Sequence, residues 1–450
     1  MRRSAVYPHI LGMLTTAAVE PLIRAPYLTV AAWLRRFDAW PDERRAAWQQ
    51  HRLAEVLRDA AGSVPFYRHL LPGGAHGVRL SDLPVVDKRQ IRDSMNDFRS
   101  EGWQHTPHVR KSTGGTTGDP WQYELDRRAW THVRGAQIHL WERTGYRYGD
   151  PIVLLGTPPS LLGGGSKFGS RLRTALEHRI YSAAGIEVDH LSSLERARAA
   201  VEADGVVWYG YASMIASMAE AVLDNGIRLN GPTAVITTSE PLHPVWRRRI
   251  ADAFGAPVYD EYGCNDGGVI ALTCPRGRFH IAENVSLVEI VEGDSPCPPG
   301  VEGDIVVTNL HARVLPFLRY RIGDRGVLAA TPCPCGRAGA TLESVNGRLG
   351  DRLVLPNGIQ LSYVNFTTIF WGTPHVRRWQ IVQEAIDRVI VRLETEPGFT
   401  TREAEQIRQA IRTRSRGQLE VDIRVGEPIE RTEAGKQRVV INRLTQVGVA

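Results

Sequence analysis

Four short apolar segments within residues 151–264 constrain the fold of this chain more than any other feature. They are PIVLLG from Pro151, VVWYGY from Val206, TAVITTS from Thr233 and APVYDEYG from Ala256. Their length and their β-branched and aromatic content are typical of buried strands. Helical stretches such as SMIASMAEAVLDNG lie between them. Because strands that alternate with helices form a largely parallel sheet, the sequence predicts an α/β body.

A later change of pattern divides the chain. From about Phe279 the segments SLVEIVEG, GDIVVTNL and LPFLRYRIGDRGVLA predict short strands separated by Gly-rich turns, as in a β-subdomain. After NGRLGD, the order strand, helix, strand predicts a small α+β domain. We therefore expect a large N-terminal domain of residues 1–350 and a small C-terminal domain of residues 351–450, since 450 residues are many for one core.

The net charge and the cysteine content limit which binding partners and which cellular compartment the sequence predicts. A net charge of +6 is mildly basic, which hints at an anionic ligand, but no Lys/Arg block is interleaved with aromatic residues, so no nucleic-acid partner is predicted. Five cysteines do not make a disulfide framework in a chain this long, which favours a reducing, cytoplasmic location. Glu20, Pro21 and Arg24 interrupt the apolar N-terminal stretch, so no transmembrane segment is predicted. We expect a helix packed on the body there, with peripheral membrane contact as the alternative.

The stretch KSTGGTTGDP, residues 111–120, suits an anion. Glycines let backbone amides approach a ligand, and hydroxyls add donors at little steric cost. An ordinary surface loop has the same composition. No lysine followed by Ser or Thr closes the stretch, so it is not a Walker A loop, and a kinase-type site is disfavoured.

Two short segments could together hold a metal. TCPRGRFH contains Cys274 and His280, and TPCPCGR contains Cys333 and Cys335. Three thiolates and one imidazole suit a closed, tetrahedral structural zinc site. Two unrelated pairs of buried residues are the alternative.

Six motifs in order carry a resemblance that spans nearly the whole chain. They are TGGTTGDP, SEPL, EYGCND, YRIGD, GRLGD and AGKQR. In this order they resemble the core motifs of the adenylate-forming ligases, the acyl-CoA synthetase superfamily. The closest pattern is that of the phenylacetate–CoA ligase and CapK-like branch. This branch also resembles the chain in the two Cys/His segments, which favours the structural zinc.

The resemblance implies a role for each motif. It implies that the phosphates of ATP are held by Thr113, Gly114, Gly115, Thr116, Thr117 and Gly118. It implies that adenine is bound by Ser239, Glu240, Pro241, Glu261, Tyr262 and Gly263, and ribose by Asp324 and Arg348. It also implies that Lys436, Thr116 and Asp266 are catalytic, that Asp266 binds Mg²⁺, and that Asp351 is the hinge of a mobile C-terminal domain.

Some residues depart from the family pattern or have an ordinary alternative role. Gly114 replaces a serine, Asp119 stands where a lysine often stands, and Asp266 replaces the usual glutamate by a carboxylate one methylene shorter. Aspartate is still a hard oxygen ligand for Mg²⁺. Without the motif order, Tyr262 would be a core tyrosine, and Asp324 with Arg348 a structural ion pair.

The resemblance implies an ATP- and Mg²⁺-dependent, AMP-forming ligase. An aromatic or aliphatic acid, held in an apolar pocket, is adenylated with release of pyrophosphate and then transferred to coenzyme A. Trp121 and Trp141 either line that pocket or pack in the core. An amine or a carrier-protein thiol as acceptor, and a homodimer through the N-terminal helices, are left open. A non-catalytic nucleotide-binding protein and an ADP-forming ATPase are the rival functions.

Overall fold

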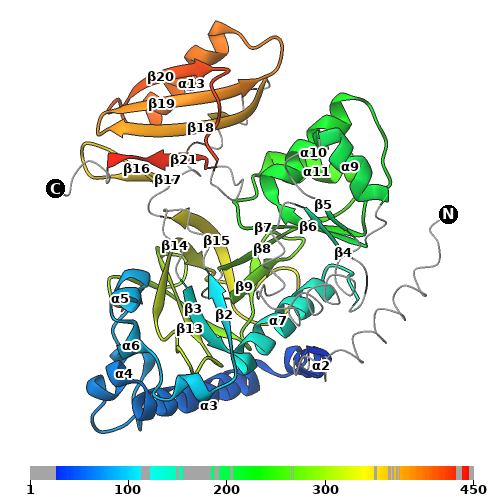
Figure 1. Cartoon of the computed structure of the whole chain (residues 1–450). Coiled ribbons are helices and arrows are strands. Elements are labelled where there is room, and N and C mark those ends of the chain that lie inside the picture. The colour runs from blue at the N-terminus through cyan, green and yellow to red at the C-terminus, as the bar shows by residue number, and fades with distance from the viewer. Residues whose placement is uncertain are drawn as a thin grey trace. The chain divides into compact units, whose positions relative to one another are not determined.

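The computed structural model forms two compact units (Figure 1), one of residues 1–322 with 327–344 and one of residues 323–326 with 345–450. The description below is limited to residues 27–112, 122–147, 150, 152–155, 184–186, 192–202, 206–264, 266, 268–348, 352–362, 366, 369–370, 373, 375–431 and 438–444. The predicted α/β class is confirmed. The predicted domain boundary at residue 350 remains a prediction.

The four apolar segments form adjacent parallel strands, as predicted. β4 (Ile152–Leu155), β6 (Val207–Tyr211), β7 (Ala234–Thr238) and β8 (Val258–Cys264) pair in that order, and β5 (Ala184–Ile186) pairs with β4 at the edge. β8 then pairs antiparallel with β9 (Gly268–Thr273). The parallel half of the sheet therefore ends at β8, which joins it to the β-subdomain.

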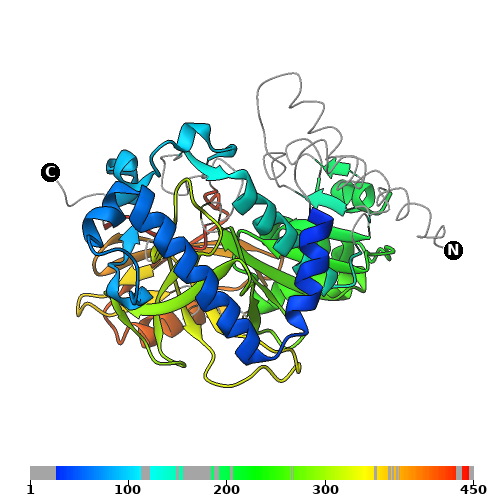
Figure 2. The same ribbon diagram turned by 90° about the horizontal axis from the view of Figure 1, so that it is seen from below.

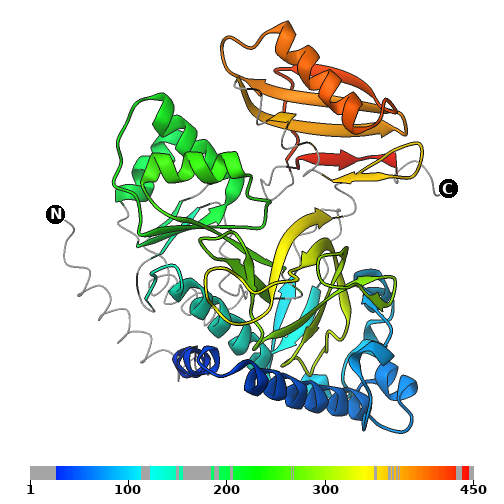
Figure 3. The same cartoon turned by 180° about the vertical axis from the view of Figure 1, so that it is seen from behind.

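The strands of the parallel half are buried on both faces because helices cover both. Val153 and Leu155 pack on one face against α9 (Ser193–Glu202), α10 (Ala212–Asp224) and α11 (Pro244–Phe254). These three helices are the green ones in Figure 3. Ile152 and Leu154, one residue out of step, pack on the other face with α7 (Arg127–Glu142) and α2 (Tyr27–Asp38). Successive side chains of a strand point to opposite faces of the sheet, so a continuous apolar run contributes to the hydrophobic cores on both faces.

The β-subdomain continues the same sheet. From β9 the order is β10 (Phe279–Ile281), β15 (Thr341–Arg348), β14 (Tyr320–Leu328), β13 (Glu302–Asn309), β11 (Ser286–Glu292) and β12 (Ser295–Pro296), with β1 (Val86–Asp87) beside β14. The long helix α3 (Asp42–Ser63), seen from below in Figure 2, is tied to the subdomain by polar contacts. Arg52 donates to the carbonyl of Leu310, and Gln49 donates to that of Glu283.

Short helices and one hairpin complete the first unit. α4 (Pro65–Leu70), α5 (Lys88–Asp93) and α6 (Met95–Phe98) follow α3, and β2 (His108–Ser112) pairs antiparallel with β3 (Gln122–Asp126). Asp126 is buried and caps the N-terminus of α7, because its carboxylate accepts from the amide of Ala129 at 2.9 Å. The same carboxylate also accepts from the amide of Arg313 at 2.7 Å. Across the described residues, no helix combines the length and apolar character needed to cross a membrane.

The second unit is a small α+β fold. The hairpin of β18 (Val376–Ala385) and β19 (Arg388–Thr395) is flanked by parallel β20 (Glu420–Val425) and β21 (Val440–Asn442), and β16 (Arg352–Val354) pairs with β17 (Gln360–Ser362). α13 (Thr401–Arg414) begins at a capping box of Thr400 and Glu403. Its Ile407 and Ile411 bury the apolar face of the helix in the core of this unit.

Two histidines are stacked in the first unit. The rings of His132 on α7 and His311 lie 3.7 Å apart between centroids with an interplanar angle of 6°. His311 donates to the carbonyl of Asn284 at 2.8 Å. Burial, with the nearby Arg128 and Arg52, lowers the pKa of His132 to about 4, and burial with the neighbouring His132 lowers the pKa of His311 well below its usual value. Both rings are therefore neutral in the folded chain at pH 7.

We expect the free energy of unfolding to fall as the pH falls from about 6.5, the ordinary pKa of histidine, toward the lowered pKa of about 4. In this window the unfolded chain binds protons that the folded chain does not. The variant His132→Phe, which keeps a stacked ring, should lose part of this dependence, up to a few kcal/mol at about 1.4 kcal/mol per pKa unit. Urea unfolding at pH 7.5 and pH 5 measures it.

The exposed His76 provides the control, since His76→Phe should unfold with the pH dependence of the wild type. An unchanged pH dependence in His132→Phe would contradict the assignment of a neutral buried pair.

Candidate active site

The predicted phosphate loop connects two paired strands. Residues 113–120 lie outside the described residues, but β2 and β3 pair from Ser112 with Gln122 to His108 with Asp126, so the two ends of the loop are adjacent. Lys111, at the base of the loop, places its Nζ 3.5 Å from the ring centroid of Trp130. Lys436 and Asp351 also lie outside the described residues. The roles predicted for these residues therefore remain predictions.

The SEPL turn follows β7 and is held by its acidic residue. Ser239 has φ of 67°, the left-handed region that non-glycine residues rarely adopt. Glu240 is buried, and its carboxylate accepts from the amide of Ser213 at 2.8 Å and from its hydroxyl at 3.0 Å. Ser213 lies in the first turn of α10, so Glu240 satisfies an amide at the helix N-terminus. The Glu240 carboxylate is thus used inside the protein.

Glu261 on β8 is buried in the same way, on the face that α7 covers. Its carboxylate accepts from Trp141 Nε1 at 2.6 Å, Tyr209 OH at 2.7 Å and Gln137 Nε2 at 2.8 Å. Arg134 in turn donates to Gln137 Oε1. Burial raises the pKa of Glu261, and these donors oppose the increase. Three of them converge on one carboxylate, so any contact of this residue with a nucleotide would come from its backbone.

Asp260, the preceding residue, is anchored on the opposite face of β8. Thr237 on β7 donates to its carboxylate at 2.9 Å, and burial raises the pKa of Asp260 to about 7. Two neighbouring acidic side chains held on opposite faces fix the register of β8. Tyr262 and Gly263 follow; Tyr262 is half-buried, with its ring centroid 6.3 Å from that of Phe279, and Gly263 is exposed. The fixed register of β8 thereby sets where these two residues lie.

The turn after β8 is joined to the YRIGD strand. Asp266 is half-buried, and Tyr320 OH donates to its Oδ2 at 2.6 Å. Tyr320 starts β14, which also carries Asp324, and Arg348 ends the neighbouring strand β15. A carboxylate oxygen is the ligand that Mg²⁺ prefers, so Asp266 fits the metal of MgATP.

The four predicted metal ligands lie together, although the two halves are far apart in the sequence. The Sγ atoms of Cys274 and Cys333 are 3.5 Å apart, and Cys335 Sγ lies 3.2 Å from His280 Nε2. All four ligand atoms lie within 4.8 Å of one another. Burial and the nearby Arg143 lower the pKa of His280 to about 4, so the ring is in the neutral form that binds metal. The donor set fits zinc.

Comparisons with known proteins find similar chains. Residues 353–443 match the family described as the CapK C-terminal domain. The phenylacetate-coenzyme A ligase of Thermus thermophilus is 25% identical over 398 residues, which cover 80% of this chain and 84% of the relative. The CapK protein of Staphylococcus aureus is 29% identical over 190 residues, 41% of this chain and 40% of that protein.

A solved structure shares the fold over nearly the whole chain. It is a 2-hydroxyisobutyryl-CoA ligase in its postadenylation state, with 20% identity, a TM-score of 0.72 and coverage of 92% of both chains. The chain therefore shares the fold of this ligase and resembles a phenylacetate-coenzyme A ligase over most of its length. These similarities support an AMP-forming ligase that resembles the phenylacetate–CoA ligase and CapK-like branch.

Four residues support the site through contacts that the motifs do not predict, although one of them, Tyr320, belongs to YRIGD. Gln137, Trp141 and Tyr209 hold Glu261, and Tyr320 holds Asp266. The spacing of four between Gln137 and Trp141 puts both on one face of α7, which is the signal the sequence offers. Trp141, expected either in the acid pocket or in the core, is 3% exposed and packs in the core.

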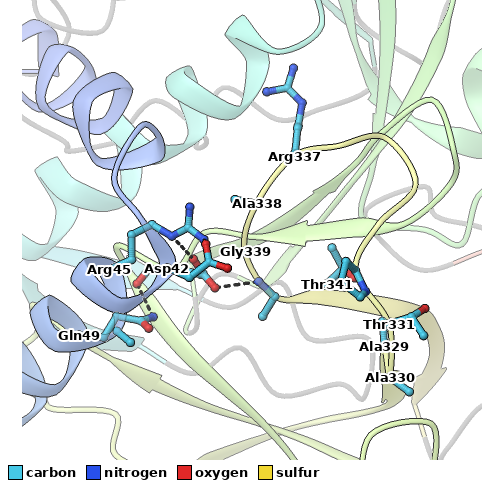
Figure 4. Close-up of a pocket in the computed structure, with 14 residues that line it drawn as sticks. Asp42, Arg45, Gln49, Ala329, Ala330, Thr331, Arg337, Ala338, Gly339 and Thr341 are labelled. Atoms are coloured by element: carbon cyan, nitrogen blue, oxygen red, sulfur yellow. Dashed lines mark hydrogen bonds and ion pairs between the residues drawn. The ribbon is translucent and has the colours of Figure 1, made fainter.

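A cavity of about 440 Å³ lies elsewhere, between α3 and the loop before β15 (Figure 4). There Arg45 pairs with Glu283 at 3.3 Å, and Glu283 accepts from the amide of Ala340 at 2.8 Å. Among the described residues that line this cavity, none belongs to the six motifs. An ion pair, Arg45 with Glu283, thus lies on its wall.

We expect Tyr209→Phe to lower the free energy of unfolding by about 1.5–3 kcal/mol, because a buried carboxylate loses one of its donors. Urea unfolding at pH 7.5 measures the change. In a Glu261→Gln background, where the charge is absent, the same substitution should cost less. Equal costs in the two backgrounds would contradict the account of the Glu261 carboxylate.

Proposed function

We propose that this chain activates a carboxylic acid with ATP and then transfers the acyl group to coenzyme A. The main support for this proposal is the hydrogen bond from Tyr320 to Asp266. It joins two of the six motifs, the EYGCND turn and the YRIGD strand. In the first step a carboxylate oxygen attacks the α-phosphorus of ATP, and the bond to the β-phosphate oxygen breaks. The products are an acyl adenylate and pyrophosphate.

The chain's own groups would lower the barrier through charge and position. Residues 113–118 would donate amides and hydroxyls to the phosphates, and Asp324 would accept from the ribose hydroxyls. Asp266 would bind Mg²⁺, which neutralises charge on the departing pyrophosphate when bound. The adenine would lie against the half-buried ring of Tyr262 and the backbone around Ser239.

Lys436 has further support from the sequence. The chain has 55 basic residues, and four of them are lysines: Lys88, Lys111, Lys167 and Lys436. In a chain that otherwise uses arginine, a lysine retained in the AGKQR motif suits a task that needs a compact, single-point charge. We propose that this task is to approach the reacting carboxylate and the α-phosphate.

The second step transfers the acyl group. The thiol sulfur of coenzyme A would attack the acyl carbon, its proton would pass to solvent or a base, and AMP would leave. We propose that the domain of residues 351–450 turns about Asp351 between the two steps. An amine or a carrier-protein thiol is the alternative acceptor.

Product analysis tests this proposal. The purified chain is incubated with ATP, Mg²⁺ and a panel of aryl, fatty and 2-hydroxy acids, with and without coenzyme A, and the nucleotides are separated by chromatography. We expect AMP that depends on the acid, and Lys436→Ala should reduce its rate about 100-fold or more, on the scale of a lost transition-state charge contact. Lys88→Ala, which keeps Lys436, is the matched control.

ADP as the product would contradict the ligase and favour an ATPase. Absence of AMP with every acid, in a chain that binds ATP, would favour a non-catalytic nucleotide-binding protein. Thioester formation that requires coenzyme A identifies the acceptor.

We also propose one structural zinc per chain at Cys274, His280, Cys333 and Cys335. The closeness of the four ligand atoms, all within 4.8 Å, supports this site. Because a closed site has no open position, the ion would brace the β-subdomain and take no part in the reaction.

Elemental analysis of the purified chain should give about one zinc per chain. Cys333→Ser should lose the ion and melt at a lower temperature, because it lacks one of the four ligands. Cys297→Ser, outside the cluster, should keep it. A wild-type chain without metal, purified in the absence of chelators, would contradict the site.

A further inference from the structure

The carboxylate of Asp266 is shorter than the glutamate of the family pattern, and a buried side chain holds it. Tyr320 is 1% exposed, and its hydroxyl donates to Asp266 Oδ2 at 2.6 Å. A phenol ordinarily loses its proton only near pH 10, so it is a donor at neutral pH. One carboxylate oxygen is thereby occupied, which leaves Oδ1 to bind a metal.

Tyr320 cannot easily follow a moving carboxylate, because the backbone on its N-terminal side is anchored. Arg319 has φ of 46° and a fully buried side chain. Its guanidinium donates to the carbonyls of Leu83 at 2.7 Å and Asp294 at 2.9 Å, and its amide donates to Thr308 Oγ1 at 2.9 Å. A non-glycine residue in this conformation persists where its surroundings determine it. The hydroxyl of Tyr320 therefore sets the position of Asp266.

The same aromatic group reaches the strand that follows the phosphate loop. The ring of Phe317 lies 5.0 Å from that of Tyr320 and 5.7 Å from that of Tyr123, measured between centroids. Tyr123 is fully buried and is the second residue of β3. Three segments distant in sequence, β3, the turn at Asp266 and the start of β14, thus meet through packed rings and one hydrogen bond.

We propose that Tyr320 is a positioning residue for the metal-binding carboxylate, holding Oδ2 of Asp266 so that Oδ1 faces the metal of bound MgATP. This inference rests on the proposed function. Mg²⁺ requires near-ideal octahedral geometry, so the orientation of a short, single-oxygen ligand matters. Groups that orient a metal ligand commonly change metal affinity about 10–100-fold.

Calorimetry with a non-hydrolysable ATP analogue tests the proposal, with Mg²⁺ and, separately, with excess EDTA. We expect Tyr320→Phe to weaken binding of the Mg²⁺-loaded analogue about 10-fold or more, on the scale of a lost orienting group, and to leave binding of the metal-free analogue unchanged. A side chain that only supports the fold would weaken both equally. Asp266→Asn should act likewise, and the double variant should be no worse than Asp266→Asn alone.

Tyr67→Phe is the matched control, since Tyr67 is a buried tyrosine of α4 that packs against Phe98, 6.2 Å away between ring centroids. It should bind both forms of the analogue like the wild type. Unchanged binding of the Mg²⁺-loaded analogue by Tyr320→Phe, or fully additive effects of Tyr320→Phe and Asp266→Asn, would overturn the proposal.

The two proposals fail separately. A wild type that makes acid-dependent AMP, with Tyr320→Phe unchanged in metal-dependent binding, overturns the role of Tyr320 and leaves the ligase. A wild type that makes no AMP, but whose Mg²⁺-dependent binding requires Tyr320 and Asp266, overturns the ligase and supports the positioning role.

Discussion

The buried carboxylate of Glu261 is the interaction on which the arrangement of the site depends. A charge without water is stable in the core only when donors surround it, and Trp141, Tyr209 and Gln137 supply three. These donors come from α7 and β6, so the carboxylate ties β8 to its neighbours on one face. Asp260 ties β8 to Thr237 on the other. A slip of one residue would exchange the two faces and leave both carboxyl groups without partners.

The position of β8 has consequences for everything that follows it. This strand is the last of the parallel half and the first with an antiparallel neighbour, so its C-terminal end opens toward the β-subdomain. Tyr262 and Gly263 lie at this end of β8, paired with Ala271 and Val269 of β9, and Asp266 lies in the turn that follows. Ligands of α/β proteins bind at the carboxyl ends of parallel strands, where loops from several strands meet. Tyr320 then holds Asp266 from the subdomain side.

The sequence predicted the sheet well because its signal is local. Apolar runs of four to seven residues between helical stretches identify β4, β6, β7 and β8 without knowledge of their neighbours. The Cys/His set was also predictable, because two short segments hold three of the five cysteines and a histidine. In the structure Cys274 and Cys333, separated by 59 positions, have their sulfur atoms 3.5 Å apart.

The residues that hold Glu261 and Asp266 in place could not be predicted from the sequence in the same way. Trp141 and Glu261 are 120 positions apart, and Asp266 and Tyr320 are 54 apart. Buried tyrosine and tryptophan are common, and a glutamine can hydrogen-bond many kinds of partner, so nothing in their own segments indicates a carboxylate partner. The acidic residues of the SEPL and EYGCND motifs were expected at the adenine, whereas their side chains serve α10 and α7. Only the folded chain reveals that the carboxylates of Glu240 and Glu261 accept hydrogen bonds inside the protein.

Exchange of labelled pyrophosphate into ATP, without any acceptor, tests the central claim most directly, because it reports a reversible acyl adenylate and nothing later. The account predicts exchange that requires both the acid and Mg²⁺ and that Asp266→Asn greatly reduces. Exchange that proceeds equally without acid, or acid-dependent turnover of ATP that yields ADP and never exchanges pyrophosphate, would contradict it.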